Sequence, residues 1–277
     1  MRLTFIGKSV IALVIFILIL YIFPKNLVIP NASDMFTAAA LLFGIIAGFF
    51  IAATLTNYFR FQSLVSVETG KLVSLYNTGI LLNPTLKTKL LAAIDKYLIR
   101  AFDYELHEYI ENTEKDFQNV IDVTKKVKKR DSDLFVHFLE IKGNIRETRQ
   151  EIMLTSRKIL GVGHWIVLII LAIVVIFLIY IMRAPGTASS IFTVLIATIT
   201  CLVLFLLYDI DSNYFAEKKI GFDVYERSFL ELGLLPYYPF ESIKKGRIKP
   251  KGKCRIGTRI GDTNLMKRKI EVVNFKK

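Results

Sequence analysis

The sequence Met35-Phe-Thr-Ala-Ala-Ala-Leu-Leu-Phe-Gly-Ile-Ile-Ala-Gly-Phe-Phe-Ile-Ala-Ala-Thr-Leu55 contains no charged residue. Its twenty-one residues are about as many as a helix needs to cross the roughly 30 Å hydrocarbon core of a membrane. Beyond Arg60, apolar residues recur at spacings of three, four and seven, the period of an amphipathic helix. They are Phe61, Leu64, Val65, Leu72, Leu75 and Tyr76. The stretch therefore predicts a membrane span that continues as an amphipathic helix.

The chain from position 31 to 83 contains no proline, so the span and its extension can form one long helix. Gly70 and Gly79 are the weak points of this helix. Asn83-Pro84 then predicts the N-cap and first turn of a new helix. A span that continues into a cytoplasmic rod is typical of a conduit or of a signal coupler, and the pattern favours neither.

The whole chain of 277 residues is 53% hydrophobic, and the apolar residues gather in four blocks. This indicates an all-α, multi-pass membrane protein. A secretory signal peptide is the alternative for the first block, but no clear small-x-small cleavage site follows it and three further blocks come later. The predicted transmembrane helices are residues 9–23, 35–58, 163–182 and 191–208.

The charged segment 59–160 predicts a cytoplasmic helical bundle between the second and third spans. Its first helix, opened by the Asn-Pro pair, carries one broad apolar stripe over residues 86–110. A second helix is expected from Glu114 to the basic cluster at 125–130. A third follows Asp131-Ser132-Asp133, which can cap it.

Residues 209–277 form a small, basic C-terminal tail. The segment from Lys244 to Lys277 contains thirteen Lys or Arg and two acidic residues. Its local net charge is therefore +11, in a chain of net charge +13. Alternation over 254–260 and 269–275 predicts two short strands, joined as a hairpin around Gly261-Asp262. The excess charge favours anionic membrane lipids as partners. A nucleic-acid partner is not expected, because no recognised motif accompanies the charge.

Positive charge is distributed unevenly around the spans. The loops after the first and third spans carry only Lys25 and Arg183. The opposite flanks carry Arg2, Lys8, Arg60, Arg157, Lys158, Lys218 and Lys219. Because cytoplasmic flanks of spans are enriched in Lys and Arg, both termini and the middle region are predicted to be cytoplasmic.

The sequence offers few residues for catalysis. His107, His137 and His164 are too scattered for a helical zinc motif, and no nucleophile elbow, phosphate-binding loop or dinucleotide fingerprint occurs. We therefore expect no enzyme, no catalytic residue, no metal and no cofactor. The spans also lack the carboxylate that a proton-driven stator subunit would need.

The second span mixes bulky and small residues. Phe43, Phe49 and Phe50 could form a hydrophobic constriction, while the interspersed Ala and Gly permit close helix contacts. The alternative is that the Phe rings face lipid and the small residues only pack helices.

Several short motifs together resemble the bestrophin-like domain family of bacterial membrane proteins. They are Thr56-Asn57-Tyr-Phe-Arg60, Val67-Glu68, Leu72-Val-Ser-Leu-Tyr76, Arg146-Glu-Thr-Arg149, Ser156-Arg157, Trp165 and Leu207-Tyr-Asp209-Ile-Asp211. The resemblance covers roughly residues 37–229. It implies four spans, a cytoplasmic helical domain and a homo-oligomeric ring, such as the pentamer of true bestrophins, which are anion channels.

The resemblance also implies candidate site residues. The Phe-lined neck of bestrophins would fall on Phe43, Phe49 or Phe50, with Asn57 just beyond. Candidate polar residues at the span ends are Arg60, Glu68, Asp209 and Asp211. Bestrophins bind calcium through an acidic cluster after the last span, but this chain offers only the two aspartates there, so calcium gating is not expected.

The leading hypothesis is an oligomeric, channel-like protein of the bacterial plasma membrane that passes small ions, with anions favoured by analogy. The alternative is a non-conducting scaffold or signalling subunit that recruits a cytoplasmic partner through its bundle and basic tail.

Overall fold

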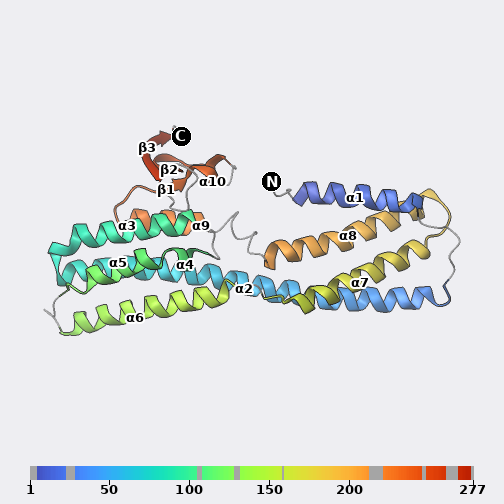
Figure 1. The fold of residues 1–277 in the computed structure, drawn as a ribbon, viewed down its shortest axis with the longest axis horizontal. Coiled ribbons are helices and arrows are strands. Elements are labelled where there is room, and N and C mark those ends of the chain that lie inside the picture. Colours follow the sequence, from blue (N-terminus) through green and yellow to red (C-terminus); the bar gives the residue numbers. More distant parts are fainter. Residues whose placement is uncertain are drawn as a thin grey trace. The chain divides into compact units, whose positions relative to one another are not determined.

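The computed structural model is mostly helical and ends in a small sheet, as predicted (Figure 1). The chain divides into two compact units, Met1–Asn57 with Lys158–Tyr214 and Tyr58–Arg157 with Phe215–Lys277. The structure describes residues 5–22, 29–104, 108–127, 132–157, 159–211, 221–244, 248–259 and 268–275.

The first unit contains the apolar helices. They are α1 (Phe5–Ile22), the first part of α2 (Ala32–Leu82), α7 (Val162–Ile181) and α8 (Thr187–Asp211). Within the described ranges, α2, α7 and α8 are long and apolar enough to cross a membrane, and α1 contributes a shorter apolar helix over Gly7–Ile22. Three of the four predicted spans are thus candidates by length and composition, and four crossings stay a prediction.

Small residues let the helices of the first unit pack closely. In α2, Ala39, Phe43 and Ala47 are buried in a cluster with side chains of α7. Those α7 side chains are Leu168, Ala172, Val175 and Leu178. A second cluster joins α1 to α8, where Ala12 and Phe16 lie with Val194 and Ala197. Each helix therefore buries one side and leaves another side apolar and exposed.

Helix α2 is continuous over 51 residues and contributes to both units. Its length confirms the predicted single helix. The Asn83 side chain accepts a hydrogen bond from the Thr85 amide at 3.2 Å and caps a 3-10 turn, Pro84–Leu86, that leads into α3 (Lys87–Asp103). The predicted Asn-Pro helix start is thereby confirmed. Gly79 does not break α2, because the side chains of Leu90 and Phe138 pack against it. A Cβ atom added at Gly79 would lie 3.0 Å from Leu90 and 3.3 Å from Phe138.

The second unit is a helical bundle with one departure from prediction. Its further helices are α4 (Tyr109–Asn112), α5 (Glu114–Thr124), α6 (Ser132–Thr155) and α9 (Gly221–Glu231). The single helix predicted over 86–110 is wrong, because α3 ends at Asp103 and Tyr104 has an extended backbone (φ −94°, ψ 157°). This break lets α5 fold back onto α3. Leu106 and Asp131 lie outside the described residues.

The tail forms a three-stranded sheet that packs on the bundle. Its elements are β1 (Tyr237–Pro239), α10 (Phe240–Lys244), β2 (Gly252–Arg259) and β3 (Arg268–Phe275). Strands β2 and β3 pair antiparallel over their full length, which confirms the two predicted strands, and β1 pairs parallel to β2. The turn predicted at Gly261-Asp262 lies outside the described residues.

Candidate functional site

The three candidate neck residues have different surroundings in the first unit. Phe43 is 7% exposed and packs in the cluster with α7. Phe50 is half-buried, and its ring meets His164 edge-on with centroids 5.2 Å apart. Phe49 is 69% exposed, and its ring lies beside that of Phe50, with centroids 5.9 Å apart. Of the three, Phe49 is therefore the one that its own unit covers least.

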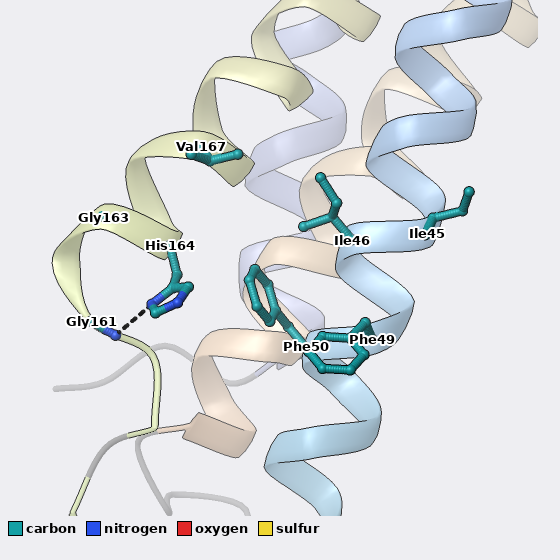
Figure 2. Close-up of a pocket in the computed structure, with 8 residues that line it drawn as sticks. All are labelled: Ile45, Ile46, Phe49, Phe50, Gly161, Gly163, His164 and Val167. Carbon is teal, nitrogen blue, oxygen red and sulfur yellow. Dashed lines mark hydrogen bonds between the residues drawn. The ribbon is translucent and has the colours of Figure 1, made fainter.

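A pocket of about 740 Å³ lies between α2 and the start of α7 (Figure 2). Helix α2 lines it with Ile45, Ile46, Phe49 and Phe50, and the α7 side lines it with Gly161, Gly163, His164 and Val167. The Gly161 amide donates a hydrogen bond to His164 Nδ1 at 3.1 Å, as Figure 2 shows. Because Nδ1 accepts, the neutral ring carries its proton on Nε2.

The two span-end aspartates hold helix ends together within the first unit. The Lys8 ammonium lies 2.6 Å from the Asp209 carboxylate and joins α1 to α8. It also lies 5.8 Å from the Tyr208 ring centroid. Asp211 accepts hydrogen bonds from the Ile159 and Leu160 amides, each at 3.1 Å. Both carboxylates therefore have local structural partners.

Asn57 and Arg60 lie on the middle of α2. Asn57 is half-buried. Arg60 lies 3.6 Å from Glu151, but both side chains are more than half exposed. A pair of this kind contributes little to stability, typically about 0–1 kcal/mol.

Glu68 belongs to a buried polar network of the second unit. Its side chain is 1% exposed, and Arg149 Nη1 on α6 lies 3.3 Å from its Oε1. The Tyr97 hydroxyl on α3 donates to the same oxygen and accepts from Arg149. Burial raises the pKa of Tyr97 well above its usual value, so this phenol stays neutral.

Arg149 extends the network to two further helices. Its Nη2 donates to the Ile110 carbonyl at 3.1 Å and to Glu114 at 3.0 Å. Its guanidinium lies 4.1 Å from the Phe117 ring centroid. One side chain that is 3% exposed thus connects α2, α3, α4, α5 and α6.

The sequence indicates this network by placing charged residues within the apolar stripes of α6 and α2. Arg149 follows Ile145 by four residues and precedes Ile152 by three, so it occupies a position in the buried stripe of α6. Glu68 likewise lies between the buried Val65 and Leu72 of α2. A charge in an apolar stripe needs a partner, because burying it alone is costly.

A second buried ionic cluster attaches the tail sheet to α3. Arg268 Nε lies 2.7 Å from Asp103, and the Tyr237 hydroxyl donates to Asp103 at 2.8 Å. Arg255 donates two hydrogen bonds to Asp95, at 2.7 and 2.8 Å. Burial raises the pKa of Asp103 to about 6, although Arg268 and the Tyr237 hydrogen bond act to lower it.

This raised pKa predicts a pH dependence of sheet attachment. Asp103 binds a proton more tightly when buried than when exposed, so its protonation stabilises the attached sheet. This contribution to the stability of the attached sheet is complete below about pH 4 and is lost as the pH rises through about 6. We expect hydrogen-exchange protection of the β2 and β3 amides, corrected for intrinsic rates, to fall between pH 5 and pH 7. In Asp103→Asn this fall should disappear, and its persistence would contradict the assignment.

In the parts of the chain that the structure describes, no group of three or more His, Cys, Asp or Glu side chains is placed to hold a metal ion.

A family model described as Bestrophin-like domain matches residues 7–214. No curated protein and no solved structure matches the chain. The matched residues begin within the first turn of α1, include α2 to α8 and end before α9 and the tail sheet.

Proposed function

The chain belongs to the Bestrophin-like domain family, and on this premise we propose that it is an oligomeric channel for small ions in the bacterial plasma membrane. Anions are the favoured ions by analogy with true bestrophins. In this proposal α1, α2, α7 and α8 cross the membrane, and both termini and the bundle are cytoplasmic. The uneven distribution of Lys and Arg around the apolar helices supports this orientation.

The observation that carries the proposal is the exposed side of α2. It presents Phe49 together with Gly44, Gly48 and Ala52, which are spaced four residues apart. No described atom outside the local helix lies within 4 Å of a Cβ built on Gly44 or Gly48. Small residues at this spacing let membrane helices approach closely. Copies of α2 could therefore meet around an axis, where a ring of Phe49 side chains would form a hydrophobic constriction.

Phe49→Ala tests the constriction. We expect the single-channel conductance of purified protein in planar bilayers to rise severalfold, because removing six phenyl carbons widens the narrowest apolar segment. Phe192→Ala is the matched control, since Phe192 on α8 is 66% exposed and lies outside the pocket. An unchanged conductance in Phe49→Ala would exclude Phe49 as the neck.

The absence of any current from a well-folded preparation, at every pH, calcium concentration and voltage tried, would overturn the channel proposal. The mass of the detergent-solubilised particle is an independent test, because a monomer has no central pore. Either result would favour the alternative of a non-conducting scaffold. It is supported by the basic tail, whose sheet lies outside the residues that match the family.

A further inference from the structure

The pocket between α2 and α7 has the size and walls of a binding site for an apolar molecule. Its volume of about 740 Å³ lies within the range of about 300–1,000 Å³ that is typical of small-molecule sites. Ile45, Phe49 and Val167 supply apolar walls, and each side chain is partly exposed. His164 is the only polar side chain among the described lining residues.

Aromatic and charged residues near the pocket are of the kinds that mark the edge of a membrane. Trp165 follows His164 directly and contacts Tyr208, with ring centroids 6.0 Å apart. The Lys8–Asp209 ion pair lies next to Tyr208. Trp and Tyr concentrate at the level of lipid headgroups, and charged pairs mark the aqueous side. With α7 and α8 crossing the membrane as proposed above, the His164 end of the pocket lies at the depth of the glycerol esters.

His164 can donate one hydrogen bond at this depth. Its Nδ1 accepts from the Gly161 amide, so the proton of the neutral ring is on Nε2. An ester carbonyl can accept that hydrogen bond, and a purely aliphatic molecule cannot. An amphipathic molecule with an apolar chain and an ester acceptor therefore matches the pocket best.

The neighbouring surface favours a lipid over a second copy of the chain. The outward side of α7 is bulky and aliphatic, with Ile166, Ile170 and Ile173 all more than half exposed. The small residues Gly44 and Gly48, which suit contacts between helices, do not line the pocket. The pocket therefore continues a surface suited to acyl chains.

We propose that this pocket binds one acyl chain of a membrane phospholipid, with its ester carbonyl at His164 and its hydrocarbon along Ile45, Ile46 and Val167. The site does not depend on ion conduction, and its test does not measure current.

The full-length protein in vesicles of phosphatidylethanolamine and phosphatidylglycerol is the test system. A trace of phosphatidylcholine with a diazirine in the middle of one acyl chain serves as the probe. After illumination, mass spectrometry should locate the label mainly in residues 45–50 and 163–167. In Val167→Trp the label there should fall about fivefold or more, because the indole takes up the apolar surface that held the chain.

Two further variants make the result decisive. Gly163→Leu should also reduce the label, because it adds an apolar side chain to a lining position where no described atom lies within 4 Å of a Cβ. Ile173→Trp is the matched control, since Ile173 is exposed on the same helix but does not line the pocket. Label spread evenly over the exposed residues of α2 and α7, or unchanged in both pocket-filling variants, would overturn the proposal. So would disulfide cross-linking of Val167→Cys to a second copy in unlabelled vesicles.

Discussion

Replacing Arg149 with methionine is expected to destabilise the helical bundle by about 3–5 kcal/mol, the cost of removing one partner from a buried ion pair. Glu68 would lose its cationic partner while its side chain stays 1% exposed. The Ile110 carbonyl would lose its hydrogen bond at 3.1 Å. Hydrogen exchange in α3, α5 and α6 of the full-length protein should accelerate accordingly.

Two comparisons separate this network from ordinary packing. Arg146→Met, on the exposed side of the same helix, should change exchange very little. The double variant with Glu68→Met and Arg149→Met should be more stable than Arg149→Met alone, because it leaves no unpaired buried charge. Arg149→Lys should not restore stability, since an ammonium cannot reproduce the planar donor arrangement. If Arg149→Met and Arg146→Met behaved alike, the network would not stabilise the bundle.

Gly257→Val should detach the tail sheet from the bundle. A Cβ at this position would lie 2.0 Å from the Tyr237 hydroxyl oxygen, far inside van der Waals contact. Tyr237 is fully buried and donates to Asp103 at 2.8 Å, so its ring cannot move without breaking that bond. Overpacking typically costs about 1–3 kcal/mol, and loss of the hydrogen bond adds to it.

Protease protection of the tail is the measurement for this variant. Gly257→Val should be cleaved between β2 and the C-terminus much faster than the unmodified protein. Thr258→Val is the control, because Thr258 is the next residue of β2 and is exposed. Equal cleavage of the two variants would show that Tyr237 and Gly257 do not fix the sheet.

The elements that follow from local pattern were predictable from the sequence. Helix α2 could be traced from Met35 to Leu82 because no proline interrupts it, and Asn83-Pro84 marked the next start. Strands β2 and β3 followed from alternation. These features depend on residues close together in the chain.

The features that depend on distant residues were not predictable. Arg149 meets partners that lie 81, 52 and 35 positions away, namely Glu68, Tyr97 and Glu114. No local pattern specifies such a meeting. The parallel pairing of β1 with β2 was also missed, and the end of α3 at Asp103 was misplaced because its apolar stripe continues past the break. The roles of Phe43, Phe49, Phe50 and Asn57 stay predictions.

The contact between Trp165 and Tyr208 has a practical consequence, because Trp165 is the only tryptophan in the chain. Indole emission from this protein therefore reports on the α7–α8 contact alone. A spectral shift would signal rearrangement among the apolar helices, whereas loss of the helical bundle would leave the tryptophan emission unchanged. Far-ultraviolet circular dichroism follows the helices of both units, so only a comparison of the two signals tells which unit has changed.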